Sequence, residues 1–363
     1  MEMTGTTIVS HSTVFKGAES SPFLAPRGIW INDTMLLVSD TGQNRVFLWP
    51  SLPGKPLEEP TVVLGQKEIP GTHRNAGQTV NAGSLQYPSG VWANHEYLVV
   101  ADAWNHRVLI WHGIPTVHGQ PADVVIGQPG FEHNLPNCYG IGAEPSPQTL
   151  NWPYGVHSDG DQLWIADTGN RRVLYYRTMP VENFTPADAV IGQEDFHYKE
   201  YDSQNAIWPY TVRVDAAGRM AITDTQYYRV LLWDDWEKAL HHPADAIIGQ
   251  PGFSDNGQNQ YGLQPSAHTL NWCYDSFFDD EGIWVADTGN SRLLGFRQVP
   301  RVHDAPADQV IGHADFETGS ENIHTVNGTE NTLYWPFSLC VHKGRMAIAD
   351  TGNHRVILTS NYT

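Results

Sequence analysis

The chain has 363 residues, of which 40% are hydrophobic and 11% aromatic, so a disordered chain is excluded. Its 40 acidic residues outnumber its 21 basic ones, and the formal net charge of -19 disfavours binding to nucleic acid or to an anionic membrane. No apolar run approaches a membrane span, no secretory signal is visible, and the three cysteines are scattered, so we expect a cytoplasmic globular protein.

One sequence phrase occurs six times, from VSDTGQNRVFLW, which ends at Trp49, to IADTGNHRVILT, which ends at Thr359. Every copy contains an aspartate followed five residues later by an arginine, and successive aspartates are 62, 65, 57, 63 and 63 residues apart. The six pairs are Asp40 with Arg45, Asp102 with Arg107, Asp167 with Arg172, Asp224 with Arg229, Asp287 with Arg292, and Asp350 with Arg355. Such regular self-similarity indicates six structural modules.

Two further phrases accompany each aspartate phrase. A proline-containing phrase such as WPYGVH, around Tyr154, comes before it, and a phrase such as VVIGQ, at Gly127, comes after it in the first five modules. Short β-branched runs punctuated by Gly, Pro and Asn predict strands. Each module therefore has four strands: one after the proline, one ending in the aspartate, one starting at the arginine and one ending at Gly-Gln. A single short helix is expected over residues 234–242.

Four-stranded modules at this spacing are typical of propeller blades. The sixth module ends at Thr359 without a Gly-Gln strand, whereas residues 6–14 at the other end are β-rich and belong to no module. The sequence therefore predicts an all-β, six-bladed β-propeller of four-stranded antiparallel blades. It forms a single domain over residues 1–363, and the N-terminal strand at residues 6–14 completes the last blade.

The phrase ADTGNHRV resembles the NHL repeat, and the triplets at residues 105–107 and 353–355 are near its consensus. The six-bladed propeller of that family agrees with the module count. The ADxVIGQ strands and long Asn-rich connections are similar to bacterial NHL proteins associated with nitrogen fixation. This resemblance implies an accessory factor whose protein partner is a nitrogenase component. Some NHL proteins bind single-stranded RNA, but the basic residues needed for that are scarce here.

The repeated residues are interpreted as scaffold. The aspartate can accept hydrogen bonds from the tight T-G-N connection while the arginine pairs with it. Gly169, Gly289 and Gly352 are expected to take a positive φ in that connection. Six identical Asp–Arg pairs are not required by any catalytic reaction, so activity is sought where the repeat changes.

Two connections between aspartate and arginine lack the glycine of T-G-N. Trp104 replaces glycine in the second module, and Gln226, Tyr227 and Tyr228 alter the fourth. We expect these tips to share a face with the long connections after each Gly-Gln, and large aromatics there suit a protein interface. The alternative is local packing against neighbouring loops. The residues predicted for partner binding are Trp104, His106, Tyr227, Tyr228, His133, Tyr139, Tyr261 and His268.

The entries to the first strand of four modules carry an aromatic residue at one equivalent position, namely Tyr154, Tyr210, Tyr274 and Phe337. Asp275 follows Tyr274 where other modules have a small residue. One interpretation is an aromatic central pocket with Asp275 as its carboxylate. The other is packing between blades.

No Walker loop, G-x-S-x-G, H-E-x-x-H or C-x-x-C motif occurs, so we expect a protein without a cofactor or metal and favour a non-enzymatic role. Five long connections carry a histidine, but their spacing predicts no common ligand geometry. These are His73, His133, His197, His268 and His324. The alternative function is a metal-dependent lyase or hydrolase at the central mouth, in which Asp275 and these histidines act.

Overall fold

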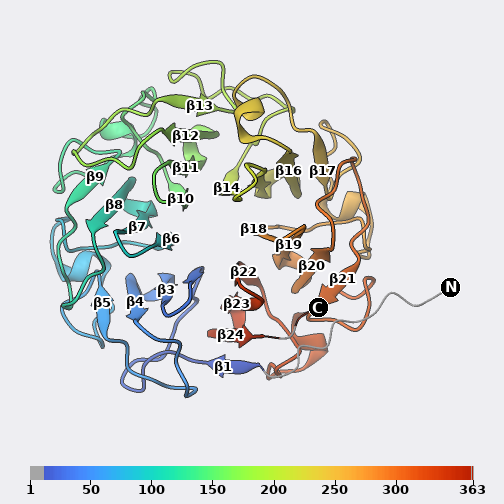
Figure 1. The fold of residues 1–363 in the computed structure, drawn as a ribbon, viewed down its shortest axis with the longest axis horizontal. Coiled ribbons are helices and arrows are strands. Elements are labelled where there is room, and N and C mark those ends of the chain that lie inside the picture. Colours follow the sequence, from blue (N-terminus) through green and yellow to red (C-terminus); the bar gives the residue numbers. More distant parts are fainter. Residues whose placement is uncertain (1–11, 361, 363) are drawn as a thin grey trace.

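Six four-stranded antiparallel sheets surround a central axis in the computed structural model, which describes residues 12–360 and 362 (Figure 1). The predicted all-β, six-bladed β-propeller is confirmed. In blades 1 to 5 the innermost strand comes first in the chain and the outermost strand last, whereas blade 6 takes its outermost strand from the N-terminal part of the chain. Within these residues no helix is long and apolar enough to cross a membrane.

The strands follow the predicted phrases. Blade 1 contains β2 (Gly28–Ile31), β3 (Leu36–Asp40), β4 (Arg45–Trp49) and β5 (Val62–Leu64). Blade 2 contains β6 (Pro88–Ala93), β7 (Tyr97–Asp102), β8 (Arg107–His112) and β9 (Val124–Ile126). Blade 3 contains β10 (Pro153–Ser158), β11 (Leu163–Asp167), β12 (Arg172–Tyr176) and β13 (Ala189–Ile191).

The remaining blades repeat this order. Blade 4 contains β14 (Pro209–Val214), β15 (Met220–Asp224), β16 (Arg229–Trp233) and β17 (Ala246–Ile248). Blade 5 contains β18 (Asp275–Asp279), β19 (Gly282–Asp287), β20 (Arg292–Phe296) and β21 (Gln309–Ile311). Blade 6 contains β22 (Pro336–His342), β23 (Arg345–Asp350), β24 (Arg355–Thr359) and β1 (Thr13–Phe15).

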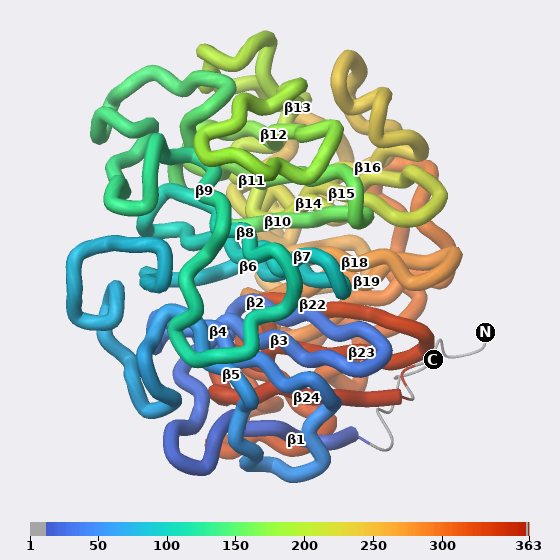
Figure 2. Tube along the Cα trace, turned by 60° about the vertical axis from the view of Figure 1, so that its left-hand side comes forward, coloured from blue at the N-terminus to red at the C-terminus, as the bar shows by residue number. Residues whose placement is uncertain are grey.

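The N-terminal strand closes the ring as predicted. Strand β1 pairs antiparallel with β24, with Thr13 opposite Leu358 and Phe15 opposite Val356. The two strands lie side by side in both views (Figures 1 and 2). Of the segment predicted to do this, residues 6–11 lie outside the described part of the chain.

Each connection from aspartate to arginine is one turn of 3-10 helix. Its last position adopts a left-handed conformation, as at His106 (φ 52°) and Arg171 (φ 56°). The prediction that the glycine takes a positive φ is therefore wrong. Gly169 is needed for space, because a Cβ atom there would lie 2.6 Å from the Cγ atom and carbonyl oxygen of Asn151.

The single helix predicted over residues 234–242 is a five-residue 3-10 helix, η7 (Trp236–Leu240). It is not the only helical segment, because 3-10 turns also occupy the six Asp–Arg connections and several long connections. The short connections close i-to-i+3 hydrogen bonds, which the strand pattern alone does not reveal.

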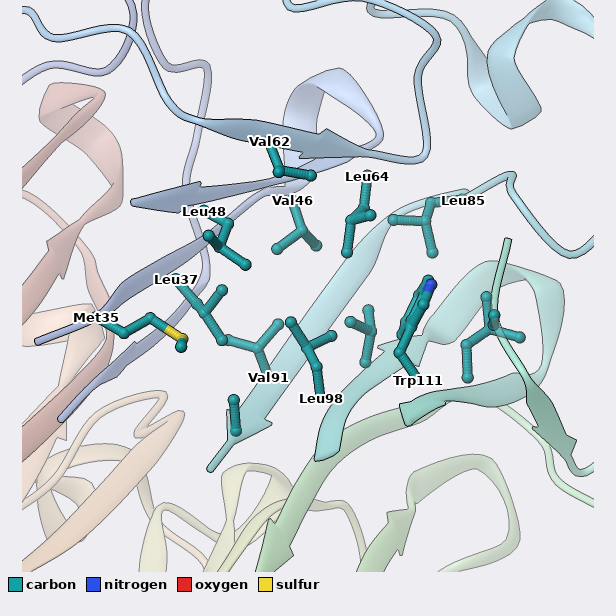
Figure 3. Close-up of a cluster of buried hydrophobic side chains, with 14 of the residues drawn as sticks. Met35, Leu37, Val46, Leu48, Val62, Leu64, Leu85, Val91, Leu98 and Trp111 are labelled. Carbon is teal, nitrogen blue, oxygen red and sulfur yellow. The ribbon is translucent and has the colours of Figure 1, made fainter. Parts of the chain in front are cut away.

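Hydrophobic side chains pack between neighbouring blades. In Figure 3, Leu37, Val46 and Leu64 of blade 1 face Val91 and Trp111 of blade 2. Comparable clusters lie at the other five blade interfaces of the described chain. Burial of each such side chain contributes roughly 1.5–3 kcal/mol. Every blade is thus stabilised mainly by its two neighbours.

The ring has two faces. One carries the Asp–Arg connections and the long connections after each Gly-Gln, and we call it the turn face. The other carries the hairpins between the first and second strands and the loops between the third and fourth, because successive turns of a meander alternate between its ends. On the turn face, Asn105 and Asn75 pair through their amides, with Asn105 Nδ2 donating to Asn75 Oδ1 at 2.8 Å.

Candidate functional site

The six Asp–Arg pairs are scaffold, as the sequence predicts. In blade 2, Arg107 Nε donates to Asp102 Oδ2 at 2.7 Å, and both side chains are fully buried. Burial raises the pKa of Asp102, although Arg107 and the hydrogen bond from the backbone of Gln86 oppose the shift. The guanidinium also donates to the carbonyls of Phe131 and Ser84, so it fixes the long connections on both sides. The equivalent pairs of the other blades are also ion pairs.

The altered turns behave differently from each other. Trp104 is exposed and stacks on Tyr87, with ring centroids 4.4 Å apart. Tyr227 is buried, lies 4.7 Å from the Arg229 guanidinium and contacts the Tyr201 hydroxyl. Trp104 therefore presents surface to solvent, whereas Tyr227 follows the local-packing interpretation.

The other residues predicted for partner binding divide in the same way. Tyr139, Tyr261, His133 and His268 are exposed on long connections of the turn face. His106 is buried, and burial lowers its pKa to about 4. Tyr228 is half-buried against Trp272, with centroids 5.3 Å apart. The ring thus does not bring all eight residues to a common surface.

A group of aromatic residues surrounds the axis on the turn face, where each first strand begins. Trp104, Trp152, Trp272 and Trp335 are 46%, 41%, 41% and 45% exposed. Trp152 also lies near half-buried Trp208, with centroids 6.2 Å apart. We call these side chains the aromatic rim, defined as Tyr87, Trp104, Trp152, Trp208, Trp272 and Trp335.

The backbone of the rim is unusual for such large residues. Trp152, Trp272 and Trp335 have φ values of 50°, 46° and 50°, in the left-handed region that bulky side chains rarely adopt. Ala25 occupies the equivalent position of blade 1 with φ 54°. The turn therefore does not require an aromatic residue, and scaffold alone does not explain the tryptophans. In the sequence each of them stands two positions before an inner aromatic, and sequence reasoning interpreted them as part of an aromatic-rimmed central pocket or as core, not as partner-binding residues.

The inner aromatics form a layer below the rim. Tyr154 stacks on Tyr210 at 4.8 Å, Tyr210 meets Tyr274 edge-on at 4.7 Å, and Tyr274 stacks on Phe337 at 4.1 Å. The Arg27 guanidinium lies 4.0 Å from the Phe337 ring centroid. The cavity that these residues help to line measures only about 10 Å³. This geometry favours packing around the axis over an open pocket.

Asp275 is fully buried on the axis side of blade 5. Its Oδ2 atom accepts hydrogen bonds from Arg213 Nη2 at 3.0 Å and from Ser338 Oγ at 2.6 Å. The backbone N–H of Leu339 also points to this oxygen at 3.3 Å. Asp275 therefore joins blades 4, 5 and 6 and is not presented as a free carboxylate at the mouth.

Arg27 is the polar residue of the axis that sequence reasoning missed. It occupies the position of Tyr154 and Phe337 in blade 1, and that departure from the aromatic pattern is visible in the phrase APRGIW. Burial alone would lower its pKa, but the phenol groups of Tyr210 and Tyr87 hold the pKa above the ordinary value. Arg27 thus places a permanent positive charge among the aromatics.

No group of three or more His, Cys, Asp or Glu side chains able to hold a metal occurs in residues 12–360 and 362. The loop histidines have separate partners: His197 Nδ1 lies 3.1 Å from the carbonyl of Pro145, and His268 Nδ1 lies 2.8 Å from that of Asp304. The metal-dependent alternative therefore has no ligand set in the described residues.

A larger hollow of about 1030 Å³ lies on the other face, between blades 4 and 5. Its walls include Arg219, which donates to Asp215 at 2.6 Å and to the carbonyl of Asp280, and whose guanidinium lies 5.3 Å from the Phe278 ring. Arg219 contacts both Asp215 and Phe278, so these three side chains offer no converging set of free polar groups to a ligand in the hollow.

No protein-family model and no curated protein matches the sequence. Among solved structures, the chain is similar to an auxiliary nutrient binding protein from Bacteroides thetaiotaomicron, with 10% identity and a TM-score of 0.53 over 97% of this chain and 76% of that one. A catalytically inactive virginiamycin B lyase from Staphylococcus aureus, with quinupristin, has 11% identity and a TM-score of 0.47 over 96% and 98%. The likeness to the nutrient binding protein concerns the fold alone, because an identity of 10% carries no functional argument.

Proposed function

We propose that this propeller is a non-enzymatic binding protein that docks a protein partner through its turn face, with the aromatic rim at the centre of the interface. The observation that carries the proposal is the exposure of Trp104, Trp152, Trp272 and Trp335 on one face. Tryptophan is enriched among the residues that dominate binding energy at protein interfaces.

The surroundings of the rim support a preformed interface. Long connections are tied to the short turns by amide pairs, such as Asn137 with Asn170 at 2.8 and 3.0 Å. The arginines of the scaffold hold the same connections through their carbonyls, as Arg172 does with Phe196 and Thr149. A surface that is already ordered loses less conformational entropy on binding.

The resemblance to nitrogen-fixation NHL proteins makes a nitrogenase component the first partner to test, in an accessory role such as protection or maturation. The formal charge of -19 disfavours a nucleic-acid partner. Exposed Tyr139 and Tyr261 of the long connections extend the same surface outwards, and we include them with the rim.

The test is a binding measurement between the full-length protein and purified nitrogenase components, followed by capture from native extract. We expect Trp104→Ala with Trp272→Ala to weaken binding by roughly 30-fold or more, as loss of interface hot spots does. Ala25 shows that the backbone at position 272 tolerates alanine.

The matched control is Val181→Ser with Val302→Ser. Both valines are exposed and lie in the loops between third and fourth strands, on the other face. The proposal requires the control to bind as the wild type does. Equal affinity of the rim variant and the wild type for the captured partner would refute the choice of surface.

A further inference from the structure

A small cavity lies on the axis of the ring, below the aromatic layer. Its lining includes Arg27, Ser89, Tyr154 and Tyr210. Arg213, three residues after Tyr210 on strand β14, also lines it. Its volume of about 10 Å³ corresponds to the space that a single water-sized particle occupies. This small space favours a single small occupant over a polyatomic one.

Positive charge exceeds negative charge around this cavity. Arg213 is paired with Asp275 at 3.0 Å. In the described part of the chain no ion pair joins Arg27 to a carboxylate. Its guanidinium lies over the rings of Phe337 and Tyr87 and interacts with the Tyr210 hydroxyl. Two guanidiniums and one carboxylate leave one positive charge without a counter-charge. Arg27 is half-buried, and a charge with reduced access to water is stabilised by a counter-charge.

Arg213 also has an unused donor. Its Nη1 atom donates to the carbonyl of Val156 at 3.2 Å and its Nη2 atom to Asp275, but its Nε–H has no hydrogen-bond partner. The residue is only 5% exposed. A charged N–H group left unpartnered in the interior is destabilising unless something accepts its hydrogen bond.

Two hydroxyl groups complete the lining. Ser89 Oγ and Tyr210 Oη lie 3.4 Å apart. Hydroxyl hydrogens rotate, so both groups can donate to a species in the cavity. The site thus offers two guanidiniums and two hydroxyls, which are the donors that an anion requires.

We propose that the axial cavity binds one halide-sized inorganic anion, with chloride as the physiological occupant. The anion accepts the free Nε–H of Arg213 and balances the charge of Arg27. A halide is larger than water, so the lining side chains must shift slightly to admit it, and phosphate and sulfate would require a larger shift. The competing occupant is a water molecule. Water would accept the hydrogen bond from Arg213 but would leave the charge of Arg27 without a counter-charge.

The decisive experiment uses bromide as the probe. Crystals of the full-length protein grown in sodium bromide are expected to show an anomalous-scattering peak on the axis between Arg27 and Arg213. A peak supports the proposal, and an ordered water or empty density at that place without anomalous signal overturns it. This readout uses the wild-type protein and does not depend on any variant folding.

A second measurement tests the role of charge in solution. At constant ionic strength, replacing sodium gluconate by sodium chloride is expected to raise the melting temperature in a saturable way, because a ligand that binds only the folded state stabilises it. Arg27→Gln should weaken the apparent chloride affinity roughly tenfold or more, since a charged partner is lost. Arg345→Gln, at an exposed position, is the control and should keep the chloride effect. An equal chloride effect in Arg27→Gln and the wild type would overturn the proposal.

Discussion

His106 Nδ1 accepts a hydrogen bond from the backbone N–H of Trp152 at 3.1 Å, and this contact joins the turn of blade 2 to the first strand of blade 3. The chain repeats the contact at other blade junctions. Asn44 Oδ1 accepts from the N–H of Tyr87 at 3.1 Å, and His354 Nδ1 accepts from that of Ala25 at 3.1 Å. In each of these turns, the residue with the left-handed backbone conformation therefore links two neighbouring blades.

This contact predicts unequal effects of two substitutions at one position. His106→Ala removes the acceptor and leaves the N–H of Trp152 without it, so we expect a loss of about 1–3 kcal/mol in the free energy of unfolding. His106→Asn keeps an acceptor and a residue that tolerates φ 52°, as Asn44 does in blade 1. We expect it to cost less than about 1 kcal/mol. Urea denaturation of the two variants measures the difference, and equal losses in the free energy of unfolding would contradict a stabilising link between His106 and Trp152.

The buried Asp–Arg pairs predict a large cost for removing one partner. Arg107→Met leaves Asp102 buried beside an apolar side chain, which typically costs about 3–5 kcal/mol. The control is Lys343→Met, because Lys343 pairs with Asp33 at 2.6 Å on the exposed surface. Surface pairs contribute about 0–1 kcal/mol. Chemical denaturation should separate the variants clearly, and a mild effect of Arg107→Met would show that the pair is not needed for the blade.

The crowded turns predict a position-dependent effect of replacing glycine by alanine. A Cβ atom on Gly289 would lie 2.6 Å from the Cγ atom of Asn271, so Gly289→Ala should cost about 1–3 kcal/mol through overpacking. Nothing lies within 4 Å of a Cβ atom built on Gly54, whose φ is also not positive. Gly54→Ala should therefore be neutral or slightly stabilising. A melting temperature unchanged by Gly289→Ala would contradict the crowding.

His157 predicts how stability changes with pH. It is buried with no hydrogen-bond partner on either ring nitrogen, and burial together with Arg213 lowers its pKa to about 3. An unfolded histidine has a pKa of about 6.5, so between pH 6.5 and 3 the unfolded chain binds a proton that the folded one does not. The contribution of neutral His157 to the free energy of unfolding is therefore fully present above pH 6.5. Between pH 6.5 and about 3 it decreases by about 1.4 kcal/mol for each pH unit.

His157→Phe removes this titration and keeps a flat ring beside Trp164. The difference in the free energy of unfolding between variant and wild type should be constant above pH 7. It should then shift in favour of the variant as pH falls to 5. Denaturant titrations at pH 8, 7, 6 and 5 give the comparison, and parallel profiles would mean that His157 has the same pKa in the folded and the unfolded protein.

The fold was readable from sequence because its determinants are local and repeated. Each aspartate and its arginine are five positions apart, and they face each other across a hairpin, as Asp167 and Arg172 do. The glycine of the turn was harder to interpret. Freedom to adopt a positive φ and lack of space for a Cβ atom both select glycine, and only the position of Asn151 distinguishes them.

The site was less accessible to sequence reasoning. Asp275 stands out as a non-repeated acid, but its partners Arg213 and Ser338 come from the two neighbouring blades and are not part of any shared motif. Arg27 also departs from the repeat. Its position among aromatic rings from other blades becomes visible only in the assembled propeller. Exposure of the rim tryptophans is likewise a property of the assembled ring.

The pairing of Thr13 with Leu358 links two segments that lie far apart in the sequence. During synthesis β1 leaves the ribosome before all the strands of the other five blades and before its partner β24. Until then the apolar flanks of blades 1 and 6 have no cover, and such long-range pairing is slow to form. Closure of the ring therefore requires a contact that can form only after β24 has been made, and apolar surface on blades 1 and 6 stays exposed until then.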